Sequence, residues 1–230
     1  MDGPNAAALV VFALAWLFYE PLLTAFGKRR GRVLNTDLTI IRTAWMQNMT
    51  SRQGRLLDGQ LLGQTLNSCS FFASSNLLLI AAASGALFGG QSTFAAVSAL
   101  EVVQTSSRML FEVQLALVVA CLARGLLDFI WAIRQLNYCL AALGATPDPL
   151  PEGERAVFGA ALARVMNPAL HSFSAGVRGY YFALAAAAWL FGPWAFMAVT
   201  LGAVGLLLWR QRWSPAASAI HDFRDLVERR

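Results

Sequence analysis

Long apolar runs recur along the chain, and they limit its fold more than any other feature. The first runs from about Ala6 to Phe26, the second from about Ser68 to Phe88, and the third from about Leu110 to Ala132. Each is long enough to cross a hydrocarbon core of roughly 30 Å as a helix that rises about 1.5 Å per residue. We therefore expect an all-α, polytopic helical membrane bundle.

Composition agrees with lipid as the solvent. Only 13% of the 230 residues are charged, whereas soluble domains carry about 25%. The net charge of +5 is interpreted as the positive-inside bias of membrane proteins rather than as a sign of nucleic-acid binding. Three dispersed cysteines and two isolated histidines indicate no disulfide framework, no zinc or haem site and no cofactor.

A fourth apolar run, residues 173–209, is ambiguous. Its thirty-seven residues exceed one span, and Gly192-Pro193 lies near its middle, between Trp189 and Trp194. Two short spans, 173–191 and 194–209, give five spans with the N-terminus outside and sixteen of the 18 Lys and Arg at the cytoplasmic side. If the run is instead one kinked span, the protein has four spans and the five arginines of the tail lie outside. The positive-inside rule favours five spans.

Three further segments have the pattern of helices at the cytoplasmic membrane surface. They are residues 28–55, 152–166 and 215–229. Asn35, Thr36 or Asp37 is a candidate cap for the first. Ser214 and Pro215 are typical of a helix start, with serine as the cap and proline at the first position.

Four segments together resemble the bacterial branch of a membrane protein family known as domain of unknown function 599. The resemblance implies a helical membrane protein, assigns no activity and suggests a bacterial inner membrane. It covers about Leu38 to Trp213 and rests on Arg42-Thr-Ala-Trp45-Met46 with Arg52 and Arg55-Leu-Leu-Asp58, on Ser70-Phe-Phe-Ala-Ser-Ser75, on Phe129-Ile-Trp131-Ala-Ile-Arg134-Gln135-Leu-Asn137-Tyr138, and on Gly176-Val-Arg178-Gly-Tyr180-Tyr181-Phe182.

Polar residues within the third apolar run are the clearest candidates for chemistry, because a charge at membrane depth must face protein or water. Arg124, Asp128 and Gln135 share one helical face, and the first two are spaced to pair. Such a pair can fix helix packing, form a station on an ion or proton path, or contact a lipid headgroup. Glu112, near the outer end of the run, is expected to be a solvated rim group rather than a ligand.

The second apolar run carries a polar stripe made of Gln60, Gln64, Asn67, Ser68, Ser74 and Ser75. It suits close helix packing with hydrogen bonds across the interface, and the alternative is a water-lined path. Arg178, at the start of the fourth run, is expected to extend to the inner interface. Alternatively, it meets Asp128, Glu112 or Glu20 in a buried network.

Nucleotide-binding, hydrolase and metalloprotease motifs are absent from the sequence, so no catalytic residue is predicted. Two functional hypotheses remain. The first is a structural or accessory membrane protein that associates with itself or with another membrane protein. The second is a small channel or transporter whose polar path combines the stripe with Arg124 and Asp128. A membrane enzyme is the weakest alternative.

Overall fold

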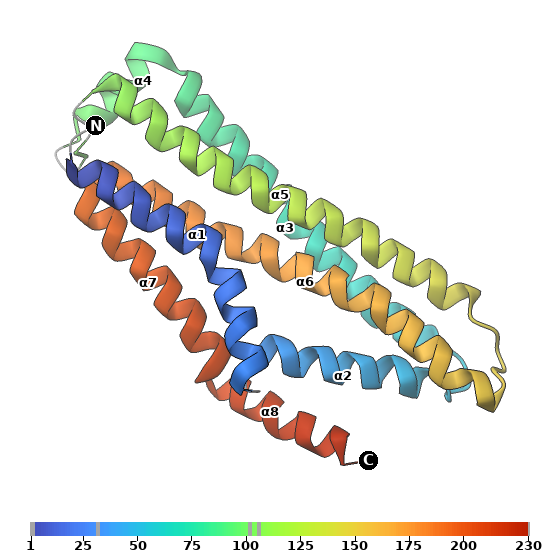
Figure 1. Cartoon of the computed structure of the whole chain (residues 1–230). Helices are drawn as coiled ribbons and strands as arrows, with labels where there is room; N and C mark the ends of the chain where they lie inside the picture. Colours follow the sequence, from blue (N-terminus) through green and yellow to red (C-terminus); the bar gives the residue numbers. More distant parts are fainter. Residues whose placement is uncertain (1–2, 31–32, 101–102, 105–106, 230) are drawn as a thin grey trace. The chain divides into compact units, whose positions relative to one another are not determined.

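A computed structural model describes residues 3–30, 33–100, 103, 104 and 107–229, without the side chains of residues 24–30. Within these ranges the regular structure is helical and contains no strand, which confirms the all-α prediction (Figure 1). The helices in chain order are α1 (Gly3–Arg30), α2 (Leu34–Met49), α3 (Leu56–Phe88), α4 (Gly90–Ser98), α5 (Arg108–Ala145), η1 (Glu152–Glu154), α6 (Arg155–Ala187), η2 (Ala188–Phe191), α7 (Pro193–Arg212) and α8 (Pro215–Glu228).

Four described segments are long and apolar enough to cross a membrane. They are Gly3–Leu23, Leu56–Phe88, Arg108–Ala145 and the segment that begins with α7 at Pro193. A multi-pass membrane protein is thereby supported, with four or more spans. The number five stays a prediction, because α6 is not among these segments.

The ambiguous apolar run is divided at Gly192. This residue has a φ of +102°, which favours glycine, and a Cβ there would lie 2.4 Å from Oε1 of Gln104. Pro193 then begins α7, where a proline needs no hydrogen-bond partner for its nitrogen. The single kinked helix that the sequence left open is therefore absent, and α6 and α7 are separate.

The predicted helix 152–166 does not exist as a separate element. Residues 152–154 form η1, and residues 155–166 are the first part of α6, which continues through Pro168 to Ala187. An internal proline removes one backbone hydrogen bond, but Met166 and Ala169 on either side of it are fully buried. Packing on both sides of the proline therefore keeps the helix continuous.

The other predicted surface segments are helical in part. The first is shorter than 28–55, since α1 extends to Arg30 and α2 runs from Leu34 to Met49; residues 31 and 32 lie outside the described residues. Val33 rather than Asn35, Thr36 or Asp37 occupies the cap position of α2. The predicted start of the tail helix is confirmed, because Oγ of Ser214 accepts a hydrogen bond from the backbone of Ala217, 3.1 Å away.

One compact unit comprises Met1–Arg29, Ser74–Leu126 and Gly176–Trp209, and we call it the apolar unit. Its core is aromatic: Phe12 contacts Phe196 at a ring distance of 5.1 Å, and Trp189 stacks on Phe196 at 4.9 Å. Here α5 and α6 approach closely, since a Cβ on Gly179 would lie 3.1 Å from Cα of Gly125. Small residues of this kind bring membrane helices together.

The second compact unit comprises Arg30–Ala73, Leu127–Ala175 and Arg210–Arg230, and we call it the charged unit. Phe129 stacks on Phe72 at a ring distance of 5.9 Å and packs against Phe173 at 6.0 Å. In the same unit α2 packs against α8. The unit thus has its own buried core.

Candidate functional site

The predicted polar stripe on α3 faces outward. Gln60, Gln64, Asn67 and Ser74 are all exposed. Within the described part of the chain, the amides of Gln60, Gln64 and Asn67 have no hydrogen-bond partner. The stripe therefore presents polar groups to whatever surrounds the molecule rather than to its interior.

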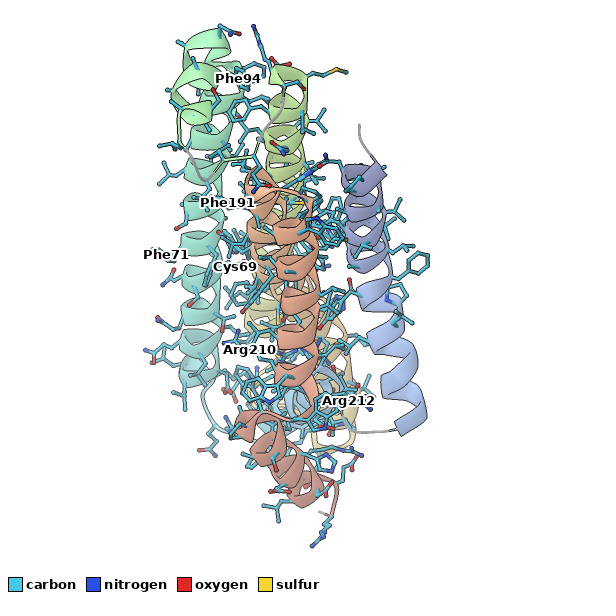
Figure 2. All side chains as sticks on the ribbon, turned by 90° about the vertical axis from the view of Figure 1, so that its left-hand side faces the viewer. Cys69, Phe71, Phe94, Phe191, Arg210 and Arg212 are labelled. Carbon is cyan, nitrogen blue, oxygen red and sulfur yellow. The ribbon has the colours of Figure 1, made fainter. Side chains whose placement is uncertain are left out.

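Polar groups on the opposite face of α3 form hydrogen bonds with neighbouring helices in each unit. In the apolar unit, Nδ2 of Asn76 donates to the carbonyl of Leu122 at 2.8 Å. In the charged unit, Sγ of Cys69 donates to the carbonyl of Phe129 at 3.5 Å. Figure 2 shows Cys69 directed toward the other helices and Phe71 directed away from them. Only the outward face of α3 is left open.

Three amide side chains lie between two apolar ones along this outward face. Leu57, Gln60, Gln64, Asn67 and Phe71 follow one another at steps of three and four residues, and all five are exposed. We call these five residues the α3 seam. Alternating steps of three and four are the spacing by which one helix packs along another.

Arg178 forms an ion pair instead of extending to the interface, so the favoured sequence prediction is wrong. Its Nη2 lies 2.7 Å from Oε1 of Glu20, and the Arg178 side chain is buried. The alternative partner Glu20 is thereby confirmed. The carboxylate of Glu20 neutralises the guanidinium at this buried position.

The other predicted polar residues lie on α5, where Glu112 accepts from Nε of Arg108 at 2.8 Å. Arg124 is exposed and belongs to the apolar unit, whereas Asp128 and Gln135 are half-buried in the charged unit. Their arrangement as a path, and the pairing of Arg124 with Asp128, stay predictions.

Sequence reasoning missed a buried cluster at the start of α3. Asp58 is 1% exposed, and its Oδ1 accepts from Nε1 of Trp45 at 2.6 Å and from Nη1 of Arg52 at 2.9 Å. Nearby, the guanidinium of Arg55 donates to the carbonyls of Thr146 and Pro147. All four side chains belong to the segment on which the family resemblance rests. That resemblance was the sequence signal that could have pointed to this cluster.

A second missed cluster joins α2 to α8. Asp37 is buried, and its carboxylate accepts from Nη1 of Arg224 at 3.2 Å, while its Oδ2 lies 3.3 Å from Nδ1 of His221. The pKa of Arg224 is raised above its ordinary value by its hydrogen bonds to Glu228 and to Asp37. Asp37 was considered only as a helix cap, because nothing local points to a partner so distant in the sequence.

Neither cluster resembles a catalytic or metal site. Across the described ranges, no group of three or more His, Cys, Asp or Glu side chains is arranged to hold a metal ion. Each buried carboxylate is instead neutralised by an arginine, which is the arrangement of a structural contact.

Comparison with curated proteins and with solved structures gives no match. The profile of a family described as "Protein of unknown function, DUF599" matches residues 7–216. The match covers most of the chain, including the Asp58 cluster and Asp37, whereas His221 and Arg224 lie beyond it. The chain belongs to this family.

Proposed function

We propose that this chain is a structural membrane protein that assembles with a second copy of itself through the α3 seam. The observation that carries the proposal is the open face of α3. All five seam residues are exposed, and within residues 57–71, which contain them, the buried residues are Asp58, Leu62 and Cys69.

The composition of the seam suits neither water nor lipid. Leu57 and Phe71 are 60% and 68% exposed, and contact of such side chains with water is unfavourable. The amides of Gln60, Gln64 and Asn67 are unfavourable in contact with hydrocarbon, where they find no hydrogen-bond partners. A second helix offers both kinds of contact along the whole seam.

A second copy fits this pattern because an amide both donates and accepts hydrogen bonds. Two identical seams related by a two-fold axis can therefore satisfy each other. Copies inserted in one membrane with the same orientation have parallel α3 helices, as in a parallel coiled coil. Polar residues at the seam positions of such pairs fix the register of the two helices.

Charge distribution supports an orientation in a bacterial inner membrane. Thirteen of the 18 Lys and Arg residues belong to the charged unit. Because cytoplasmic segments carry the excess of Lys and Arg, the charged unit and the C-terminus lie on the cytoplasmic side and the N-terminus lies in the periplasm. A periplasmic reporter fused after Arg230 that becomes active would contradict this orientation.

Disulfide cross-linking in native membranes tests the assembly. Phe71→Cys is compared with Leu127→Cys, which places a thiol on α5 of the same unit at a similar exposure of 63%. The native Cys69, Cys121 and Cys139 are fully buried, so the introduced thiol is the accessible one. A disulfide needs Cα atoms within about 7 Å, so we expect covalent dimers for Phe71→Cys alone.

Equal cross-linking of both variants, or none for either, contradicts assembly through the seam. The transport alternative makes a different prediction for the same protein. In that case, thiols placed at Gln64, Ser74 and Asp128 react with a water-soluble maleimide at all three positions, and ion flux in liposomes changes in Arg124→Ala. Protection of the three positions favours packing.

A further inference from the structure

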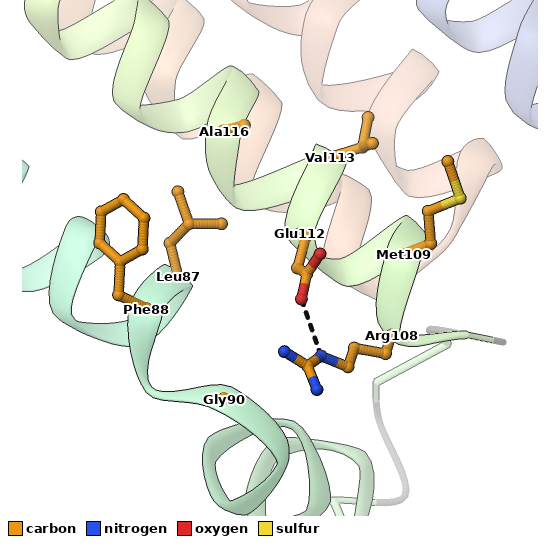
Figure 3. A pocket seen from close by; sticks show the side chains of 8 residues that line it. All are labelled: Leu87, Phe88, Gly90, Arg108, Met109, Glu112, Val113 and Ala116. Carbon is orange, nitrogen blue, oxygen red and sulfur yellow. Dashed lines mark hydrogen bonds and ion pairs between the residues drawn. The ribbon is translucent and has the colours of Figure 1, made fainter.

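The apolar unit contains an open groove where α3 ends and α5 begins (Figure 3). Its volume is about 500 Å³, within the usual range of about 300–1,000 Å³ for small-molecule sites. The residues that line it are Leu87, Phe88, Gly90, Arg108, Met109, Glu112, Val113 and Ala116. None of them belongs to the α3 seam, so the groove is independent of the proposed assembly.

The wall of this groove is apolar except at one end. Leu87 and Phe88 come from the end of α3 and face Val113 and Ala116 of α5 (Figure 3). Phe88 and Met109 are 83% and 77% exposed, which is unfavourable in water and ordinary in contact with acyl chains. The polar end consists of Arg108 and Glu112, one helical turn apart.

In a bilayer crossed by α3 and α5, this groove would lie at the boundary between hydrocarbon and headgroups. Both α3 and α5 are among the segments that can cross a membrane, and the groove is formed by the last residues of one and the first residues of the other. The N-terminus of α5 adds the partial positive charge of its helix dipole beside Arg108. An anionic group is favoured at that point, and Glu112 offers a cation site next to it.

We infer that this groove binds a bilayer phospholipid with a primary-amine headgroup, such as phosphatidylethanolamine. One acyl chain lies along Leu87, Val113 and Ala116. The phosphate is bound by the guanidinium of Arg108, and the ammonium group donates to the carboxylate of Glu112. The charged end of the groove thus complements a headgroup that carries one positive and one negative charge.

Headgroup chemistry distinguishes this lipid from the other common ones. A phosphatidylcholine headgroup has no N–H with which to donate to Glu112. A phosphatidylglycerol headgroup has no cation, and Glu112 would repel its negative charge. Selectivity for the primary amine is therefore the specific expectation, whereas an unselective apolar groove would bind all three lipids alike.

Native mass spectrometry of the full chain, delipidated in neutral detergent, tests the inference. Phosphatidylethanolamine, phosphatidylcholine and phosphatidylglycerol with identical acyl chains are titrated separately. We expect the first to bind about tenfold more tightly than either of the others, because one hydrogen bond to a charged group is at stake. Equal binding of the three lipids, or no binding, overturns the proposal.

Two variants and a matched control assign the binding to this groove. Glu112→Gln is expected to remove the preference for the primary amine, and Ala116→Phe to weaken the binding of all three lipids by filling the groove. Glu228→Gln is the control, since Glu228 also pairs with an arginine four residues away at 2.8 Å and has an exposure of 44%, compared with 42% for Glu112. Unchanged selectivity in Glu112→Gln, or an equal loss in Glu228→Gln, overturns the site.

A cysteine at Met109 separates the lipid from a second protein copy as the occupant. A lipid-filled groove leaves the Met109→Cys thiol without a protein partner, so we expect no covalent dimer in native membranes. Efficient dimer formation at this position would show that another copy covers the groove, and the proposal would fail.

Discussion

The apolar unit and the charged unit use polar residues in different ways. Each contains segments of the same three long helices, α3, α5 and α6. The charged unit nevertheless holds thirteen of the 18 Lys and Arg and nine of the 13 Asp and Glu. The density of charged residues therefore changes along each of these helices rather than from one helix to the next.

The two units differ in the polar contacts that their buried side chains make. In the apolar unit, Trp189 Nε1 donates to Oδ1 of Asn5 at 2.8 Å, and Arg178 pairs with Glu20. In the charged unit, Asp37 and Asp58 each bind two side chains. Loss of one partner in the charged unit therefore leaves each of these two carboxylates with another side-chain contact.

The largest effect is expected for Arg178→Ala. Breaking a buried pair from one side costs about 3–5 kcal/mol, and because the Glu20 side chain is 43% exposed we expect the low end of that range, about 3 kcal/mol. The free energy of unfolding, measured by SDS titration in mixed micelles, should fall by that amount. A loss below about 1 kcal/mol, the range of an exposed pair, would contradict the contrast between the units.

The double variant Glu20→Met with Arg178→Met is the control for this result. Replacing both members of a buried pair by apolar residues is often neutral or stabilising. We therefore expect it to recover most of the stability lost in Arg178→Ala. Failure to recover would mean that the pair does more than neutralise charge.

Asp37→Ala should have a smaller effect, about 2–3 kcal/mol, because hydrogen bonds to a charged group are worth about 1.5–3 kcal/mol. Its partners His221 and Arg224 retain contacts with Asp225 and Glu228. Hydrogen exchange should accelerate in α8 and remain unchanged in α7. Asp225→Ala is the control, since its carboxylate is 3.9 Å from Nε2 of His221 and 46% exposed, and it should leave α8 protected.

Trp45→Phe should lower the free energy of unfolding by about 1–2 kcal/mol. One hydrogen bond to the buried carboxylate of Asp58 is lost, while that carboxylate keeps its contact with Arg52. Trp131→Phe in the same unit is the control, because Trp131 is 49% exposed and exposed substitutions stay within about 0.5 kcal/mol. Equal losses in the two variants, measured by the same SDS titration, would show that ring size rather than the hydrogen bond matters.

The smallest effect on stability is expected for Glu112→Gln in lipid-free detergent. Exposed ion pairs contribute about 0–1 kcal/mol, and both Arg108 and Glu112 are exposed to about half their area. We expect a change below about 0.5 kcal/mol in the free energy of unfolding. A loss as large as that of Arg178→Ala would place this pair among the buried contacts and would weaken its assignment to a headgroup.

Much of the helical pattern could be predicted from the sequence, because local signals decide it. The break at Gly192-Pro193 and the cap at Ser214 are local signals of this kind. The continuity of α6 through Pro168 is not, since Nδ2 of Asn167 donates to Oγ1 of Thr43 and Met166 is buried. Contacts from elsewhere in the chain outweigh the local preference there.

The candidate site was predicted in part for a similar reason. The stripe on α3 follows from helical spacing, so Gln60, Gln64 and Asn67 could be grouped without a structure. The partners of Arg178 and Asp37 could not be chosen, because Glu20 is 158 residues from Arg178 and Arg224 is 187 residues from Asp37. Periodicity gives the direction of a side chain but not the element that it meets.

The contact of α2 with α8 ties C-terminal residues to the buried carboxylate of Asp37. A shortened protein that ends before Ser214 would lose both His221 and Arg224. The buried carboxylate of Asp37, near the other end of the sequence, would then lack both of these partners. Such a truncation would damage α2 as much as the tail, and its phenotype would say little about α8 itself. Fusions placed after Arg230 leave this contact intact and are the safer way to attach a tag or a reporter.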